Sequence, residues 1–210
     1  CGECPWPQPT GWQSPFCPNN LHRTMMQRVA PYTLRGFLYY QGEEDVSRYE
    51  GYSDMMVALV KQWRMDWNDW SLPFLFVQLP MYLAIDTEDD KKWAMQREQQ
   101  AIAAAMLKRV GMISMTDCGE FDNIHPLDKE TPGTRLALLA EQMVYGTGEE
   151  WTPTVQQMYS DGTALYLVFD HVADGLVIHA SQPETCQIAG ADGVYYPAKA
   201  EVLHSNIVRV

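Results

Sequence analysis

Three uninterrupted apolar runs, with amphipathic helical patterns between them, leave few folds open to this chain. The runs are LRGFLYYQ (34–41), LPFLFVQL (72–79) and VGMISMTD (110–117). A strand that is apolar along its whole length is one that is buried on both faces. Strands of this kind that alternate with helices predict an α/β domain, with a parallel sheet between layers of helices.

The segments between these runs have the spacing of helices. One helix is expected over 46–67 with Asp45 as its N-cap, and a second over about 90–109. The inward-facing candidates on the second helix are Trp93, Ala94, Ala101, Ala105 and Met106. A third helix is expected to have Thr131 as its cap and Pro132 at its first position, and to end at Gly146. Because a parallel sheet usually has about five strands, three strands predict an incomplete sheet.

The pattern changes beyond Glu150. Short β-type runs follow, separated by Gly, Asp and Pro turns, at 163–170, 175–180, 195–203 and 206–210. We therefore predict two domains, an α/β domain over 1–150 and a small antiparallel β module over 151–210. The last run reaches Val210 without a following turn, so the module is also expected to be incomplete.

Composition narrows the possible partners. Hydrophobic residues make up 46% of the chain and charged residues 20%, which is typical of a packed globular core. The formal net charge of −12 argues against nucleic-acid binding, because a phosphate backbone would be repelled. No apolar run approaches the roughly 20 residues of a membrane span. Cys1 and Cys4 form a CxxC, but no second pair or His cluster at zinc spacing accompanies it, so ordinary thiols are expected and a metal or redox site is the alternative.

Polar residues follow the first and third apolar runs, where an α/β sheet collects its ligands. The second of these clusters holds Asp122 three residues before His125. An aspartate in the same loop can accept from one imidazole nitrogen and leave the other as a general base. A solvated loop histidine is the alternative, since this spacing also arises by chance.

The first cluster contains Gly42, directly after the first run. A glycine N–H at such a turn can stabilise an oxyanion, although an ordinary turn glycine is the alternative. Together with His125 it points to acyl transfer, which requires a nucleophile. None of the eight serines lies in a GxSxG turn. Cys118 has no cationic sequence neighbour that would lower its pKa, so the predicted pair has no evident nucleophile.

Several ordered blocks resemble the sialate O-acetylesterase family, which belongs to the SGNH (GDSL-like) hydrolases and has acetylxylan esterase relatives. These blocks are RGFLYYQGEED, LPFLFVQL, WAMQREQQ and DxGxxDNIHPxxK, and the resemblance runs from about 15 to 146 and into the β module. It implies a three-layer αβα SGNH-hydrolase-like fold and a carboxylic ester hydrolase with a Ser–His–Asp arrangement.

The resemblance also implies roles for individual residues. His125 matches the catalytic base and Asp122 the acid that orients it. Gly42 matches the oxyanion-hole glycine, with Gln41 and Glu43 on either side of it.

Two further positions are less clear. Asp45 stands where many members have Asn as a second oxyanion donor, and a carboxylate cannot donate unless it is protonated. Arg97 matches a recurrent arginine with a structural or substrate-orienting role, although a surface helix residue is an equal alternative.

The family's early serine block is absent from these 210 residues. The chain is therefore expected to be truncated at both ends and inactive by itself. The resemblance implies hydrolysis of acetyl esters on sugars, sialic acid in particular, without a metal or organic cofactor. It also implies a secreted, periplasmic or lysosomal location. The alternative is a non-catalytic carbohydrate-binding or scaffold protein, favoured by the missing nucleophile and the seven Trp and eleven Tyr.

Overall fold

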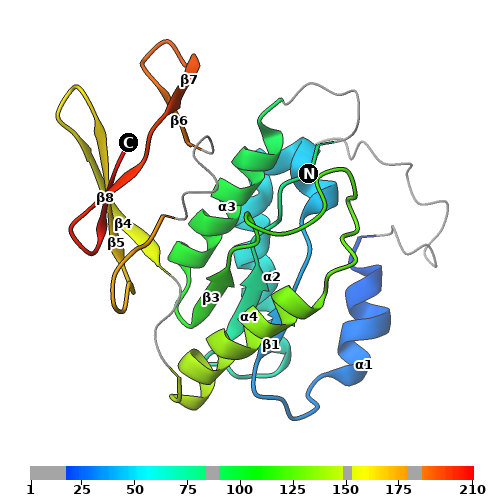
Figure 1. The fold of residues 1–210 in the computed structure, drawn as a ribbon. Helices are drawn as coiled ribbons and strands as arrows, with labels where there is room; N and C mark the ends of the chain where they lie inside the picture. The colour runs from blue at the N-terminus through cyan, green and yellow to red at the C-terminus, as the bar shows by residue number, and fades with distance from the viewer. Residues whose placement is uncertain (1–17, 84–89, 149–152, 179–185) are drawn as a thin grey trace. The chain divides into compact units, whose positions relative to one another are not determined.

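The computed structural model describes residues 18–83, 90–148, 153–178 and 186–210 (Figure 1). Contacts divide the chain into two compact units, Cys1–Gly146 and Thr147–Val210. Each unit is described by itself below.

The first unit contains a parallel sheet of three strands in the order β1-β2-β3. The strands are β1 (Phe37–Tyr39), β2 (Phe74–Val77) and β3 (Val110–Ile113). Phe37 is in register with Phe74, which pairs in turn with Val110. All four residues of β2 are buried, as expected for a central strand that is covered on both faces. The predicted parallel strands are confirmed, although each is shorter than its apolar run.

The helices of this unit follow in chain order. They are η1 (His22–Met26), α1 (Gln27–Val29), η2 (Glu43–Gly51), α2 (Tyr52–Asp66), α3 (Lys92–Met106), α4 (Glu130–Ala140) and η3 (Glu141–Tyr145). Within the described ranges, no helix combines the length and the hydropathy that crossing a bilayer requires.

The helix predicted over 46–67 begins earlier and in a different form. A 3₁₀ segment starts at Glu43, with Gly42 as its N-cap, and α2 follows from Tyr52. Asp45 lies in the first turn of the 3₁₀ segment, so the prediction that it caps the helix is wrong. Its carboxylate instead accepts hydrogen bonds from the side chains of Gln41 and Arg48.

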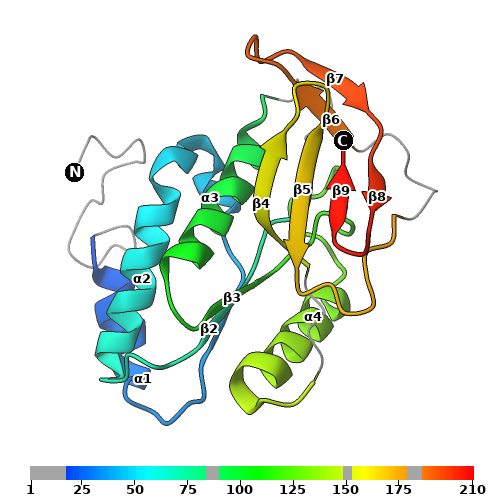
Figure 2. The same ribbon diagram turned by 90° about the vertical axis from the view of Figure 1, so that its left-hand side faces the viewer.

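Helices cover the two faces of the sheet. The ring of Phe74 packs against Trp63 of α2, with 5.7 Å between the ring centroids. On the opposite face, Leu139 of α4 packs closely on β3, because a Cβ at Gly111 would lie 2.9 Å from Leu139 Cδ2. Figure 2 shows α2 and α3 on one side of the sheet and α4 on the other.

Helix α3 buries a different stripe from the predicted one. Its buried residues are Gln96, Gln100 and Ala103, whereas Ala94, Ala105 and Met106 are exposed. The prediction was wrong because it ranked alanines above glutamines, yet the Gln100 amide bonds to backbone atoms at the strand ends. A buried amide with such partners is compatible with a core position.

Helix α4 begins two residues earlier than predicted. It starts at Glu130, and the carboxylate of Asp128 accepts the Thr131 N–H at 3.0 Å. Gly146 ends the helical region with φ +66°, which confirms the predicted stop.

The second unit is built from antiparallel strands. These are β4 (Thr154–Ser160), β5 (Leu165–Asp170), β6 (Cys186–Ala189), β7 (Tyr195–Ala198), β8 (Glu201–Leu203) and β9 (Ile207–Arg209). One sheet has the order β4-β5-β9-β8, and β6 pairs with β7. Strands are confirmed at 163–170 and 206–210, and the predicted strand over 195–203 is two strands.

Three differences remain in this unit. Strand β6 (Cys186–Ala189) lies outside the predicted runs. Residues 175–178 form no strand, and 179–180 lie outside the described residues. Strand β4 was missed because all seven of its residues are exposed, so it carries no hydrophobic periodicity to detect.

Candidate active site

Gly42 lies just beyond the carboxyl end of β1, at the start of η2. It is buried and has φ +150°, a conformation that favours glycine. A Cβ there would lie 3.1 Å from Gln96 Nε2, 3.2 Å from Gln100 Nε2 and 3.3 Å from the Tyr52 hydroxyl. Three polar side chains therefore occupy the space that any other residue would need.

The peptide that joins Gln41 to Gly42 is held from the protein interior. The Gln41 carbonyl accepts hydrogen bonds from the Tyr52 hydroxyl at 3.1 Å and from Gln100 Nε2 at 3.4 Å. Gln100 also accepts the Leu79 N–H at 2.9 Å and donates to the Val77 carbonyl at 3.3 Å. One helix residue thus ties together the ends of β1 and β2.

The sequence reasoning missed Gln96 and Gln100 as site residues, although both lie in the WAMQREQQ block. Their spacing of four places them on one face of a helix, and this was the available signal. Both side chains are fully buried. The Gln96 amide has no hydrogen-bond partner among the residues that the structure describes.

Side chains next to Gly42 form a chain of hydrogen bonds. Tyr39 donates its hydroxyl to Gln41 Oε1 at 3.0 Å, and Gln41 Nε2 donates to Asp45 Oδ2 at 2.8 Å. Arg48 donates to the other oxygen of Asp45 at 3.1 Å. The contacts of Asp45 are those of an acceptor, which offers no second donor for an oxyanion.

Two polar clusters follow strand ends, residues 41–45 after β1 and residues 117–125 after β3. These strand-end clusters approach each other at Tyr40. Burial, followed by the nearby Glu43 and Cys118, raises the pKa of Tyr40 to about 12. Lys129 Nζ lies 5.1 Å from the centroid of the Tyr40 ring. Cys118 and Lys129 lie on either side of His125 in the chain and Glu43 begins η2, so the loop that carries His125 lies near the start of η2.

The loop with Asp122 and His125 is shaped by Glu120 and Asn123. Glu120 accepts the Leu127 N–H and the Asn123 side-chain amide, each at 2.6 Å. Asn123 Oδ1 accepts the His125 N–H at 3.0 Å. The side chains of Asp122 and His125 are exposed, and in the described part of the chain no hydrogen bond joins them. Their catalytic pairing stays a prediction.

Asp117, at the start of this loop, is held by Arg135 of α4. The guanidinium donates to both carboxylate oxygens, at 2.7 and 2.6 Å, and to the Ser114 carbonyl at 2.6 Å. These hydrogen bonds from Arg135 lower the pKa of Asp117 to about 2, against the opposing effect of burial.

We expect Asp117→Asn to lower the free energy of unfolding at pH 7 by about 0.5–1 kcal/mol, because solvent screens an exposed pair. The folded pKa is depressed, so this stability is present above the ordinary pKa and is lost as the pH falls toward about 2. Urea unfolding should show a constant difference from wild type between pH 7 and 5 and a smaller one at pH 3. The exposed Asp54→Asn is the control, and a difference independent of pH would contradict the prediction.

The described residues near His125 do not supply a nucleophile. Burial raises the pKa of the Cys118 thiol and outweighs the opposing Arg135 guanidinium, which the sequence reasoning did not anticipate. Ser114 Oγ lies 3.2 Å from Thr116 Oγ1. In the described ranges, no hydrogen bond links a serine to His125, and no group of three or more His, Cys, Asp or Glu side chains is placed to hold a metal ion.

Arg97 lies on α3 with a half-buried side chain. Its backbone carbonyl accepts a hydrogen bond from Gln78 Nε2 at 3.0 Å, which links the end of β2 to this helix. Its substrate-orienting role stays a prediction.

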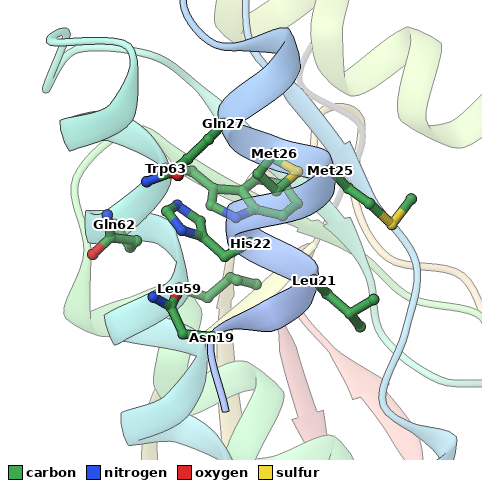
Figure 3. Close-up of a pocket in the computed structure, with 9 residues that line it drawn as sticks. All are labelled: Asn19, Leu21, His22, Met25, Met26, Gln27, Leu59, Gln62 and Trp63. Carbon is green, nitrogen blue, oxygen red and sulfur yellow. The ribbon is translucent and has the colours of Figure 1, made fainter. Parts of the chain in front are cut away.

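A cavity of about 560 Å³ lies between η1 and α2 (Figure 3). It is lined by Asn19, Leu21, His22, Met25, Met26, Gln27, Leu59, Gln62 and Trp63. His22 points toward α2 and lies 2.6 Å, Nε2 to Oδ2, from Asp66. The lining contains no serine, threonine or cysteine and none of the predicted site residues, so the cavity is not the candidate centre.

Comparison with known proteins identifies relatives of this chain. Residues 9–144 match the family described as carbohydrate esterase, sialic acid-specific acetylesterase. The sialate O-acetylesterase of Rattus norvegicus is 29% identical over 142 residues, which cover 60% of this chain and 26% of that protein. The Homo sapiens enzyme is 28% identical over 161 residues, which cover 69% and 30%.

A solved structure is also similar. The carbohydrate acetylesterase of Xanthomonas citri superposes with a TM-score of 0.78 and 31% sequence identity, over 86% of this chain and 42% of that one. The chain thus spans less than a third of the two mammalian relatives. Both strand-end clusters fall within the matched segment.

Proposed function

Because the chain belongs to the sialic acid-specific acetylesterase family of carbohydrate esterases, we propose that the protein hydrolyses acetyl esters on sugars, with O-acetylated sialic acid as its substrate. The observation that carries this proposal is the family match over 9–144, which contains both Gly42 and His125. The parallel sheet with helices on both faces supports a three-layer SGNH-hydrolase-like domain as its scaffold.

The proposed reaction begins with attack of a serine hydroxyl on the acetyl carbonyl. His125 takes the serine proton and returns it to the departing sugar oxygen, while Asp122 holds the imidazole. The Gly42 N–H stabilises the negative oxygen of the tetrahedral intermediate. Water, activated by His125, then attacks the acetyl-serine ester and releases acetate.

This reaction needs a serine that the described residues do not place near His125. We propose that it lies in a segment that precedes Cys1, which agrees with the 26% of the rat relative's length that this chain spans. The 210 residues alone are then expected to be inactive.

The experiment measures acetate release from O-acetylated sialic acid and from acetylated xylan, for the full-length protein and for the 210-residue chain. We expect turnover by the full-length protein, faster on the sialic acid ester, and none by the chain alone. Turnover by the chain alone would contradict the position of the serine. Faster release from xylan would contradict the proposed substrate.

A non-catalytic carbohydrate-binding protein is the second candidate. It is favoured by the exposed His125, which has no hydrogen-bonded serine in the described part of the chain. Sugar binding without acetate release, together with an upstream sequence that lacks a glycine-flanked serine, would establish it.

A further inference from the structure

We infer that Tyr52 and Gln100 are positioning residues that aim the Gly42 N–H at the reacting carbonyl oxygen and strengthen it as a donor. The inference rests on the proposed function, since it concerns the same oxyanion site. It follows from the two hydrogen bonds that these side chains make to the Gln41 carbonyl.

The Gln41 carbonyl and the Gly42 N–H belong to one peptide group. This peptide is trans, and a trans peptide is planar with its C=O and N–H pointing in opposite directions. Any group that fixes the direction of the carbonyl therefore fixes the direction of the N–H as well.

Both donors to this carbonyl come from the interior. Tyr52 is 3% exposed and Gln100 is fully buried. With the carbonyl drawn inward, the Gly42 N–H points away from these two donors. Among the described residues it donates to no protein acceptor, so it remains able to bind an oxygen of the substrate.

The same contacts polarise the peptide. Hydrogen bonds accepted by a carbonyl increase the positive charge on the N–H of that peptide, because linked hydrogen bonds strengthen one another. Since Asp45 acts as an acceptor, oxyanion stabilisation in this cluster depends on the Gly42 N–H. The strength of that single donor then affects the rate directly.

The two donors are themselves held in place. Gln100 is fixed by Leu79 and Val77 at the end of β2. Burial, with a smaller effect from Tyr39, raises the pKa of Tyr52, so its hydroxyl keeps its proton. Both groups are therefore preorganised before substrate binds, as electrostatic catalysis requires.

Tyr52→Phe tests the inference in the active full-length protein, because it removes the hydroxyl and keeps the ring. Loss of a whole oxyanion donor costs roughly 10²–10³-fold in kcat. Loss of one of the two hydrogen bonds to the Gln41 carbonyl weakens this donor without removing it, so it should cost about tenfold. KM should change by less than about twofold, because the effect is on the transition state. Adding Gln100→Leu should bring the loss to about 100-fold.

Tyr166→Phe is the matched control. It removes a phenolic hydroxyl that bonds to Asp161 in the second unit and is not bonded to Gln41. We expect its kcat to stay within about twofold of wild type. An equal loss in Tyr166→Phe and Tyr52→Phe would overturn the inference.

A second measurement does not depend on turnover. In protein labelled with ¹⁵N-glycine, the Gly42 amide resonance should move in Tyr52→Phe and stay in place in Tyr166→Phe. An unchanged kcat and an unmoved resonance in Tyr52→Phe would overturn the inference and leave the esterase proposal intact. If wild-type protein released no acetate, the esterase proposal itself would fail, and this inference with it.

Discussion

Replacing His125 with alanine is expected to lower kcat for acetate release by about 10³-fold or more, as removal of a catalytic base does in Ser–His–Asp enzymes. The protein should remain folded, because the His125 side chain is exposed and alanine keeps the N–H that Asn123 accepts. Stopped assays with O-acetylated sialic acid at saturating concentration measure the loss. Added imidazole should restore part of the activity, which a purely structural defect would not allow.

The control for this variant is His204→Asn. His204 is an exposed histidine in the second unit with φ +57°, a conformation that asparagine tolerates. It should keep wild-type kcat. Asp122→Ala should lose about 10²–10⁴-fold if it orients the imidazole. Nearly full activity in His125→Ala would remove the basis for the proposed mechanism.

Replacing Gly42 with alanine is the second change with a large expected effect. The new Cβ would lie 3.1 Å from Gln96 Nε2 and 3.2 Å from Gln100 Nε2, and the backbone would keep an unfavourable positive φ. The peptide must shift to relieve this contact, which moves its N–H. We expect kcat to fall by about 10²–10³-fold, the cost of losing one oxyanion donor.

Strain at this position should also lower the free energy of unfolding by about 1–3 kcal/mol. Gly133→Ala is the matched control, because it lies in α4 with no atom within 4 Å of the added Cβ. Alanine there should keep activity and add about 0.5–1 kcal/mol of stability. Equal kcat values in Gly42→Ala and wild type would rule out the glycine as the oxyanion donor.

The strands of the parallel sheet were predicted better than the details of the helices. Complete burial of β2 follows from an apolar run, because both faces of a central parallel strand must leave water. The face that α3 buries could not be predicted from its hydrophobicity pattern. Gln96 and Gln100 are polar residues, and a hydrophobicity pattern assigns them to the surface although both are fully buried.

In the candidate site, too, some features were predicted from the sequence and others were not. The QGE and DxxH blocks located Gly42 and His125 at two strand ends, since motif spacing is a local property of the chain. The hydrogen bonds that Glu120 accepts from Asn123 and Leu127 also join residues close in the chain. They depend on a loop conformation that hydrophobic periodicity does not predict. The predicted N-cap at Asp45 was wrong for a similar reason, because Gln41 and Arg48 compete for its carboxylate.

The sequence by itself determined that three strands run parallel between helices and that polar residues gather at their carboxyl ends. Hydrophobic periodicity carries this information, since burial of apolar side chains dominates the free energy of folding. Only the tertiary structure decided which side chains surround the Gln41–Gly42 peptide. Tyr52 and Gln100 lie 11 and 59 residues from Gln41 in the chain. Packing of α2 and α3 against the sheet brings their hydrogen-bond donors to one carbonyl, and such geometry exists only once the helices have docked.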